Sequence, residues 1–347
     1  MKALVMREYN KFTVEDVEKP SFGEEDVLIK VKACSICGSD VHGMDGSSGR
    51  RIPPIIMGHE AAGVIEEVGS AVKGWSKGDR VTFDSTIYCG KCHYCESGYV
   101  NLCGDRKVLG VSCDEYRQHG ALAEYVAVPA RILYHLPDNV SFEHAAMVEP
   151  VAVAYHAVMR AGMKAGQNAL VIGAGTIGVL IMQVLKAFGC SKIIAVDTLD
   201  EKLDLAKEMG ADITFNSTKT DVLKEISDMT NGEGLDLAFD AVGISPTVPQ
   251  AIKAVRKGGT VVLVGNLAPE VTFPLQPAVI RQLNIFGTCN SQGEYPECME
   301  LISKGKIKLD LLLSARITLE QAHEYFHRLY NKEKGLIKVV VVMEDDE

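Results

Sequence analysis

The sequence lacks a long apolar run, an excess of positive charge, and any internal repeat or low-complexity segment. Without about 20 consecutive apolar residues, it offers no candidate for a membrane-spanning helix. The formal net charge of −10 argues against nucleic acid or an anionic membrane as the main partner. Arg7 and Glu8 interrupt the first apolar residues, so we expect no signal peptide and a cytoplasmic location.

The composition is that of an ordinary globular protein, with 47% hydrophobic and 24% charged residues. A chain of 347 residues is long enough for two domains, each with a sizeable core. In a reducing cytoplasm its cysteines, 10 in all, are expected to serve metals rather than disulfides. The acidic residues 344–347 are expected to form a solvated tail.

Four cysteines lie close together in the sequence: Cys89, Cys92, Cys95 and Cys103. Their spacing suits one tetrahedral metal ion, and four thiolates leave no open position, so the spacing predicts structural zinc. A disulfide pair would need an oxidising compartment, and four unrelated core thiols would rarely group so tightly. His93 is expected to be a surface residue rather than a further ligand. The other cysteines, which show no metal spacing, are expected to be core or incidental thiols: Cys34, Cys113, Cys190, Cys289 and Cys298.

Short predicted strands fill the first half of the chain, separated by glycine and proline. They lie at Val27–Val31, Ala62–Val68, Arg80–Phe83 and Ala123–Val128. This density of strands and turns predicts a barrel-like β domain over residues 1–152, with the cysteine lobe at about residues 86–105.

From about residue 153, apolar strands alternate with helical stretches, which predicts a parallel sheet covered on both faces over residues 153–290. The predicted strands are Asn168–Ile172, Lys192–Val196, Leu235–Phe239, Thr260–Val264 and Leu283–Phe286. The predicted helices are Val179–Phe188, Asp200–Met209 and Pro246–Arg256. Residues 291–347 are expected to return to the first domain, with helices near Tyr295–Lys304 and Leu319–Asn331 and a last strand at Lys338–Val342.

A glycine-rich motif, Gly173-Ala-Gly175-Thr176-Ile177-Gly178, follows one of these strands and opens a helix. The motif alone is weak, but this context is the one that a dinucleotide requires. The first glycine permits a tight turn, the second lets backbone approach the pyrophosphate, and the third allows close helix packing. The free amides of the helix N-terminus favour phosphate.

The next predicted strand is followed by Asp197, where a carboxylate can hold the ribose hydroxyls of the adenosine. It would repel a 2′-phosphate, and the residues after it, Thr198-Leu199-Asp200, include no arginine to bind one. The pattern therefore predicts NAD rather than NADP. Taken alone, Asp197 would more simply be a turn carboxylate at a strand end.

A second group of metal-ligand types is spread along the chain: Cys37, His59, Glu60 and Glu149. A thiolate, an imidazole and a carboxylate suit a catalytic zinc, which keeps three protein ligands and an open position. Each residue also has a simple structural interpretation, such as a core thiol or a turn carboxylate. Sequence spacing makes this site plausible and does not by itself bring the residues together.

The combined pattern resembles the zinc-dependent medium-chain alcohol dehydrogenases over nearly the whole chain. The motifs that carry it are Cys37-Gly-Ser39-Asp40-Val-His42, Pro54-Ile-Ile-Met-Gly-His59-Glu60, the four-cysteine lobe, Glu149-Pro-Val, and Gly173 to Gly178 with Asp197. The resemblance implies a GroES-like β-barrel catalytic domain, an inserted Rossmann domain with a doubly wound parallel sheet, and two zinc ions per subunit. Within the family, Glu149-Pro150 resembles the sorbitol dehydrogenase-like polyol branch.

The resemblance also implies roles for single residues. Zinc held by Cys37, His59 and a carboxylate would bind a substrate hydroxyl, and the substrate carbon would pass hydride to the nicotinamide. Ser39, a cofactor ribose hydroxyl and His42 would carry the proton away, although a turn serine and a surface histidine are the alternatives.

The same resemblance assigns supporting residues. Asp40 would orient the metal ligands. Glu60 and Glu149 both remain candidates for the carboxylate ligand. Lys202 falls where the family contacts ribose, with a solvated helix lysine as the alternative, and Val264 is a further cofactor-binding candidate.

The implied activity is oxidation of a secondary alcohol of a polyol, sugar or sugar derivative with NAD. Gly43 and Thr288-Cys289 replace residues that touch substrate in sorbitol dehydrogenases, so sorbitol itself is in doubt. The alternatives are an L-threonine 3-dehydrogenase and a catalytically silent scaffold that binds NAD and zinc. A homodimer or homotetramer, paired through the edge strand Leu283–Gly287, is expected.

Overall fold

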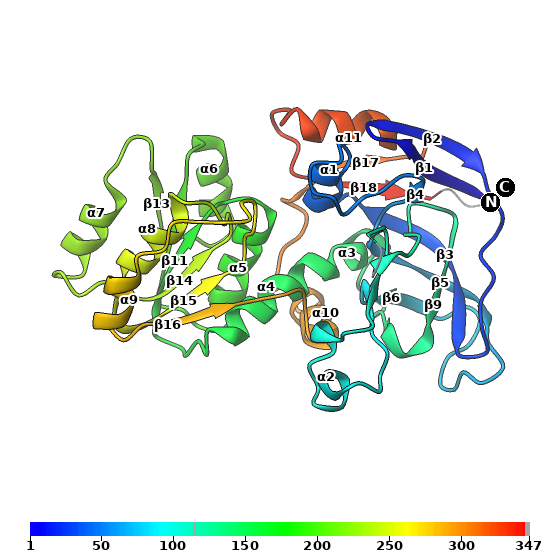
Figure 1. Cartoon of the computed structure of the whole chain (residues 1–347), viewed down its shortest axis with the longest axis horizontal. Coiled ribbons are helices and arrows are strands. Elements are labelled where there is room, and N and C mark those ends of the chain that lie inside the picture. Colours follow the sequence, from blue (N-terminus) through cyan, green and yellow to red (C-terminus); the bar gives the residue numbers. More distant parts are fainter. Residues whose placement is uncertain (114–115, 344–347) are drawn as a thin grey trace. The chain divides into compact units, whose positions relative to one another are not determined.

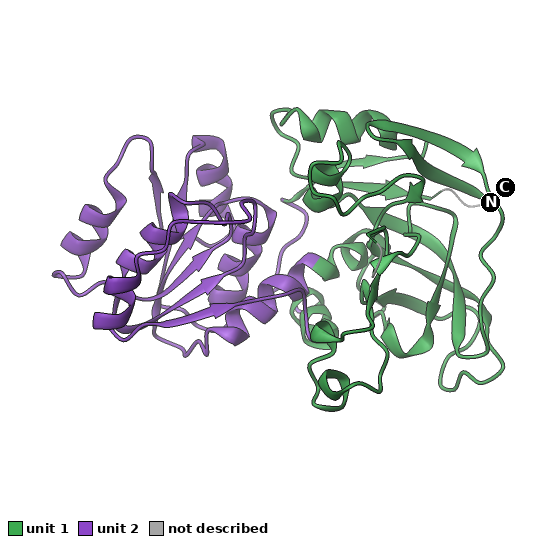
Figure 2. Cartoon of the chain, in the orientation of Figure 1, with its two compact units in different colours: residues 1–149, 295–303, 312–347 green, residues 150–294, 304–311 purple. Residues whose placement is uncertain are grey.

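The computed structural model describes residues 1–113 and 116–343, so the predicted tail at 344–347 lies outside the described residues. The chain divides into two compact units (Figure 2). Unit 1 contains Met1–Glu149, Tyr295–Ser303 and the chain from Leu312 onward, and unit 2 contains Pro150–Glu294 and Lys304–Leu311. Among residues 1–113 and 116–343, every helix is too short or too polar to cross a bilayer.

Unit 1 is built on a seven-stranded sheet with β3 (Asp26–Ser35) at its centre (Figure 1). β3 pairs antiparallel with β5 (Glu60–Val68), β9 (Tyr125–Pro129) and β18 (Lys338–Val342). The remaining strands of this sheet are β6 (Arg80–Phe83), β10 (Leu133–His135) and β17 (Leu313–Ile317). The last strand thus joins the N-terminal sheet, as the sequence predicted.

The register of these pairs positions the residues that matter later. Ser35 lies opposite Glu60 in the β3–β5 pair, and opposite Val340 in the β18–β3 pair. Alternate residues of β3, such as Val27, Ile29 and Val31, face a shared apolar core because side chains alternate across a strand. The ends of β3, β5 and β18 therefore meet at one rim of the core.

Smaller elements complete unit 1. A second sheet has the order β2 (Lys11–Asp16), β1 (Lys2–Glu8) and β4 (Ile55–Ile56), and β7 (Thr86–Ile87) pairs with β8 (Lys107–Val108). The helices are α1 (Gly38–Gly43), α2 (His93–Glu96), α3 (Phe142–Ala146), α10 (Tyr295–Ser303) and α11 (Ala322–Tyr330). α4 (Val148–Arg160) runs across the boundary between the units.

Unit 2 is a six-stranded parallel sheet with the order β13-β12-β11-β14-β15-β16. The strands are β11 (Asn168–Ile172), β12 (Lys192–Asp197), β13 (Ile213–Asn216), β14 (Leu235–Asp240), β15 (Val255–Leu263) and β16 (Asn284–Gly287). The helices are α5 (Thr176–Ala187), α6 (Asp200–Glu208), α7 (Val222–Met229), α8 (Thr247–Ala254) and α9 (Leu275–Ile280). This is the doubly wound order, whose switch point lies between β11 and β14.

The boundary predicted between the third helix and the next strand of unit 2 is wrong. The helix predicted at Pro246–Arg256 ends at Ala254, and β15 begins at Val255 rather than at Thr260. Val255 pairs with Leu235 of β14 ahead of a register shift, so it extends the sheet instead of the helix. A β-branched residue with a strand neighbour favours this outcome, which helical periodicity alone did not reveal.

Candidate functional site

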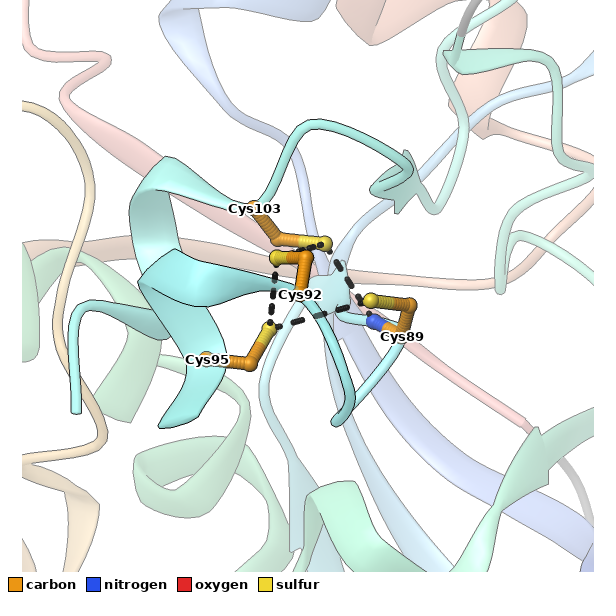
Figure 3. A group of neighbouring side chains, drawn as sticks. All are labelled: Cys89, Cys92, Cys95 and Cys103. Carbon is orange, nitrogen blue, oxygen red and sulfur yellow. Dashed lines mark hydrogen bonds between the residues drawn. The ribbon is translucent and has the colours of Figure 1, made fainter. Parts of the chain in front are cut away.

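Two groups of metal-ligand side chains lie in unit 1, and a nucleotide-type loop lies in unit 2. The first group is the cysteine lobe (Figure 3). Cys89 follows β7, Cys92 precedes α2, Cys95 lies within α2, and Cys103 follows the 3₁₀ turn Val100–Leu102. The sequence spacing therefore becomes a set of four thiols pointing inward from one short, folded segment.

The distances within the lobe fit a metal ion. Sγ of Cys95 lies 4.0 Å from Sγ of Cys89 and 3.5 Å from Sγ of Cys92. Sγ of Cys92 in turn lies 3.8 Å from Sγ of Cys103. A tetrahedron with metal–sulfur bonds of about 2.3 Å has sulfur–sulfur edges of about 3.8 Å. A disulfide would need about 2.0 Å. The four thiols thus suit zinc and are not paired with one another.

The second group brings together Cys37, His59 and Glu60, whose ligand atoms all lie within 4.8 Å of one another. Cys37 precedes α1, and His59 and Glu60 lie where β5 begins. His59 and Glu60 are buried, and Oε1 of Glu60 has no hydrogen-bond partner in the described part of the chain. A buried carboxylate oxygen is costly to leave unpaired, so the donor set fits a metal ion beside it.

The other oxygen of Glu60 is held from two sides. Lys338 of β18 forms a buried ion pair with Oε2, and the hydroxyl of Ser35 donates to the same oxygen. Nζ of Lys338 also donates to the carbonyl of Ile36 over 3.2 Å. Burial alone would lower the pKa of Lys338, but the Glu60 carboxylate beside it raises that pKa overall. The ammonium of Lys338 therefore stays charged inside the unit.

A second buried ion pair lies on the imidazole side of this group. Asp40 of α1 is fully buried and pairs with Arg51, whose Nη2 is 2.8 Å from Oδ1. Oδ2 of Asp40 lies 3.3 Å from Nδ1 of His59, and the described residues give neither atom a hydrogen-bond partner. Burial raises the pKa of Asp40, but His59 and Arg51 together bring it below its usual value.

Glu149 does not join this group. It lies in the first turn of α4, and its Oε1 accepts a hydrogen bond from Ser85 Oγ at 3.3 Å. Burial, with a contribution from nearby Glu60, raises the pKa of Glu149 to about 7. The two candidate carboxylates thus differ: Glu60 lies against a cation, and Glu149 in an environment that favours its neutral form.

Ser39 and His42, the residues expected to move a proton, both lie on α1. Oγ of Ser39 donates to Sγ of Cys37 over 3.3 Å, and Nη2 of Arg51 donates to the same hydroxyl over 3.3 Å. The side chain of His42 is exposed. Ser39 is thus adjacent to the metal-ligand group, while His42 faces solvent.

In unit 2, the glycine motif joins β11 to α5. Gly173 has a φ of +93°, and a Cβ on Gly178 would lie 1.8 Å from the carbonyl oxygen of Gly173. Gly175 precedes α5, which begins at Thr176 and continues through Ile177. The first glycine thus makes the turn and the third allows the helix to approach it, as the motif predicts.

Asp197 ends β12 next to this loop. Its Oδ2 accepts from the amide of Ala174 at 2.8 Å, and its Oδ1 accepts from the amides of Thr198 and Leu199. Lys202 is half-buried on α6. Val264 directly follows β15, and the amide of Val264 donates to the carbonyl oxygen of Asp240 over 2.9 Å. Because the strands are parallel, Gly173, Asp197 and Val264 all lie at the carboxyl edge of the sheet.

Sequence reasoning missed three residues around the metal-ligand group: Ser35, Arg51 and Lys338. Lys338 had a usable signal, because it stands in an otherwise apolar strand. A lysine is rarely buried unless it is paired. Ser35 and Arg51 gave none, since their partners come from other segments.

Comparison with known proteins agrees with both units. Residues 23–138 match the family model described as alcohol dehydrogenase GroES-like domain, and residues 176–304 match zinc-binding dehydrogenase. The chain is 40% identical to the L-idonate 5-dehydrogenase of Vitis vinifera over 87% of its length and 83% of that protein. It is 36% identical to the D-xylulose reductase A of Aspergillus oryzae over 94% and 93% of the two chains.

Among solved structures, one from Sinorhizobium meliloti, a putative zinc-binding dehydrogenase bound to NADP, has a TM-score of 0.90 to this chain. The two are 32% identical, and the match covers 98% of each chain.

Proposed function

Because the chain belongs to the zinc-dependent medium-chain alcohol dehydrogenases, in their polyol dehydrogenase-like branch, we propose that it transfers a hydride from a secondary hydroxyl of a polyol, sugar or sugar derivative to NAD. Relatives named for L-idonate and D-xylulose support this substrate class. The observation that carries the proposal is the grouping of Cys37, His59 and the unpartnered Oε1 of Glu60 within 4.8 Å.

Cys37, His59 and Glu60 would hold the catalytic zinc, and the lobe of Cys89, Cys92, Cys95 and Cys103 would hold a second, structural zinc. When bound, the catalytic ion supplies Lewis-acid chemistry that lowers the pKa of a substrate hydroxyl. We favour Glu60 over Glu149 as the carboxylate ligand because Lys338 and Ser35 both contact Oε2 of Glu60, while Oε1 has no partner in the described part of the chain. Glu149, with a pKa of about 7, would remain nearby as a neutral or singly charged group.

Ser39 would take the proton that the substrate hydroxyl gives up, and the exposed His42 would release it to solvent. Ser39 is suited because its hydroxyl lies against Cys37. An imidazole that faces water is suited because its ordinary pKa is near neutral. Asp40 would keep His59 in the orientation that presents Nε2 to the metal.

The cofactor is a nicotinamide dinucleotide, and we propose NAD rather than NADP. The loop Gly173–Gly178 would bind the pyrophosphate, with Thr176 and Ile177 at the helix N-terminus and Val264 and Lys202 nearby. Asp197 would meet the adenosine ribose, and a 2′-phosphate would be repelled by it and by Asp200. The ammonium of Lys219 is paired with Asp200 over 2.5 Å. The Sinorhizobium meliloti relative is bound to NADP, so the assay below compares the two cofactors.

We further propose a homodimer or homotetramer in the cytoplasm. β16 is the edge of the unit 2 sheet, and Leu275, Val279 and Ile280 of α9 beside it are all more than half exposed. An apolar surface next to an open sheet edge is normally covered.

The threonine dehydrogenase alternative is not favoured. The relatives reported above carry sugar-acid and sugar names, and Arg51, the buried arginine beside Ser39, is already bound by Asp40. A silent scaffold is disfavoured because the chain keeps the metal-ligand group together with Ser39 and His42.

The test is NADH or NADPH formation against polyols, sugar acids, sugar-alcohol phosphates and L-threonine, with and without a zinc chelator. We expect chelator-sensitive turnover of a polyol or sugar derivative, faster with NAD. Turnover of threonine alone would overturn the substrate class. No turnover by protein that contains zinc and binds NAD would overturn the proposed activity.

A further inference from the structure

Arg51 is a buried arginine with no role assigned so far. It stands in the segment between α1 and β4, and its side chain is 4% exposed. Nε and Nη2 both donate to Oδ1 of Asp40, over 3.0 and 2.8 Å. Nη2 donates to Oγ of Ser39 over 3.3 Å, and Nη1 donates to the carbonyl of Arg50 over 3.3 Å. One guanidinium therefore connects the proposed proton acceptor with the carboxylate that faces His59.

The Arg51 side chain packs against the backbone of one glycine, Gly43. A Cβ added to Gly43, the last residue of α1, would lie 2.5 Å from Cγ and 3.3 Å from Cβ of Arg51. The first of these distances is too short for carbon atoms, so a larger residue at this position would push the Arg51 side chain away. The aliphatic part of the Arg51 side chain can therefore occupy its position only because residue 43 has no side chain.

The contact with Arg51 determines which hydrogen bonds the hydroxyl of Ser39 donates and which it accepts. A hydroxyl has one hydrogen and two acceptor positions. Arg51 can only donate, so it occupies one acceptor position, and the hydrogen of Ser39 points to Sγ of Cys37. One acceptor position remains for an incoming proton.

We propose that Arg51 is a positioning residue that holds the hydroxyl of Ser39 in place for proton transfer and, through Asp40, fixes the ring of His59. This inference rests on the proposed dehydrogenase function. In the step concerned, the substrate O–H bond breaks and its proton forms a new O–H bond on Ser39. The O–H bond that Ser39 had before breaks, and that proton passes to His42 and then to solvent. The hydride leaves the substrate carbon for the cofactor. Arg51 keeps all its protons, because a guanidinium is not deprotonated in proteins.

The main test compares Arg51→Gln and Arg51→Lys with Arg50→Gln, which changes charge equally at an exposed neighbour. We expect Arg51→Gln to lower kcat roughly 100-fold with KM little changed, as for loss of a positioned proton-transfer group. The solvent deuterium isotope effect on kcat should rise, because proton transfer becomes slower than hydride transfer. Added guanidinium at millimolar concentration should restore part of kcat. Lysine should rescue poorly, since a point charge cannot reach both Ser39 and Asp40.

Zinc affinity gives a readout that does not need turnover. Loss of a residue that orients a metal-bound histidine typically costs 10- to 100-fold in metal affinity, so competition with a chelator should show roughly a tenfold loss in Arg51→Gln. Arg50→Gln should match the wild type. If Arg51→Gln and Arg50→Gln have equal zinc affinity and equal solvent isotope effects, the positioning role is wrong.

Gly43→Ala is the second variant, in case Arg51→Gln does not fold. It leaves Arg51 in the sequence but displaces its stem, so we expect the same isotope and zinc changes in weaker form. Wild-type behaviour of a folded Gly43→Ala would overturn the proposal. If the wild type turns over no alcohol, the proposed function fails, and the zinc comparison still decides whether Arg51 supports His59.

Discussion

The two metal-ligand groups of unit 1 are built in opposite ways. The cysteine lobe takes four identical ligands from one short segment, and three of its thiols are partly exposed. The group of Cys37, His59 and Glu60 takes three different ligands from two segments, one directly before α1 and one where β5 begins, and two of the ligands are buried. Within the lobe, backbone amides donate to the thiols, as the amide of Cys89 does to Sγ of Cys103 over 3.3 Å.

The surroundings differ as much as the ligands. The mixed group is enclosed by two buried ion pairs, Arg51 with Asp40 and Lys338 with Glu60. Buried charges cost free energy unless their partners are in place, so this arrangement is sensitive to the loss of any member. A closed thiolate set stabilises a local fold, whereas a mixed set with an open position serves chemistry. The two sites are therefore distinguished both by the type of their ligands and by the buried charges around them.

The largest expected effect is at His59. His59→Ala should remove one zinc equivalent and lower kcat/KM by at least roughly 1,000-fold, since Lewis-acid stabilisation is worth several kcal/mol. Steady-state kinetics and metal analysis of purified protein measure both. The matched control is His93→Ala in the lobe, which should keep both zinc ions and full activity. Loss of lobe zinc in His93→Ala, or retained activity in His59→Ala, would contradict the division of roles.

A smaller effect, on stability, is expected at Lys338. Lys338→Met leaves the buried Glu60 carboxylate without its cation, which should cost about 3 kcal/mol of unfolding free energy in metal-free protein. Zinc should reduce this loss, because the ion supplies the missing positive charge. Chemical denaturation with and without chelator measures it.

The double variant with Glu60→Gln sharpens the Lys338 prediction. Removing both charges should recover much of the lost stability, because no uncompensated charge remains. If the losses of unfolding free energy in Lys338→Met and Glu60→Gln simply add in the double variant, the two side chains do not stabilise each other.

The smallest effect on catalysis is expected in the lobe. Cys95→Ser should remove the structural zinc and lower the unfolding temperature, while kcat at 25 °C changes by less than about twofold, because the opening is local. Metal analysis, thermal unfolding and kinetics on one preparation check this. A large fall in kcat with the rest of the fold intact would mean that the lobe supports the catalytic group directly.

The same contrast explains what the sequence could predict. The metal site of the lobe could be predicted because its four cysteines lie close together in the sequence, so their spacing alone limits where their sulfur atoms can lie. The glycine motif was readable for the same reason: Gly173, Gly175 and Gly178 act within one turn. The strand–helix alternation of unit 2 was also local, apart from the early start of β15, which a neighbouring strand decides.

The mixed group was predicted only as a set of residue types with the help of family resemblance. Nothing in the spacing of Cys37 and His59 shows that their strands meet, because strand pairing is long-range. The choice between Glu60 and Glu149 depends on burial and on Lys338, and Arg51 depends on the shape of α1. These are properties of packing, which periodicity and motif do not contain.

β18 has a consequence for how the protein is made. Lys338 reaches the carbonyl of Ile36 across 302 residues of sequence, so the ribosome must synthesise nearly everything between them before this pair can form. Until then, a nascent chain would carry the Glu60 carboxylate beside an unfinished sheet. Contacts of such long range form late in folding. We therefore expect the lobe to acquire its zinc early, on the growing chain, and the mixed group to become competent for metal only after β18 has been synthesised.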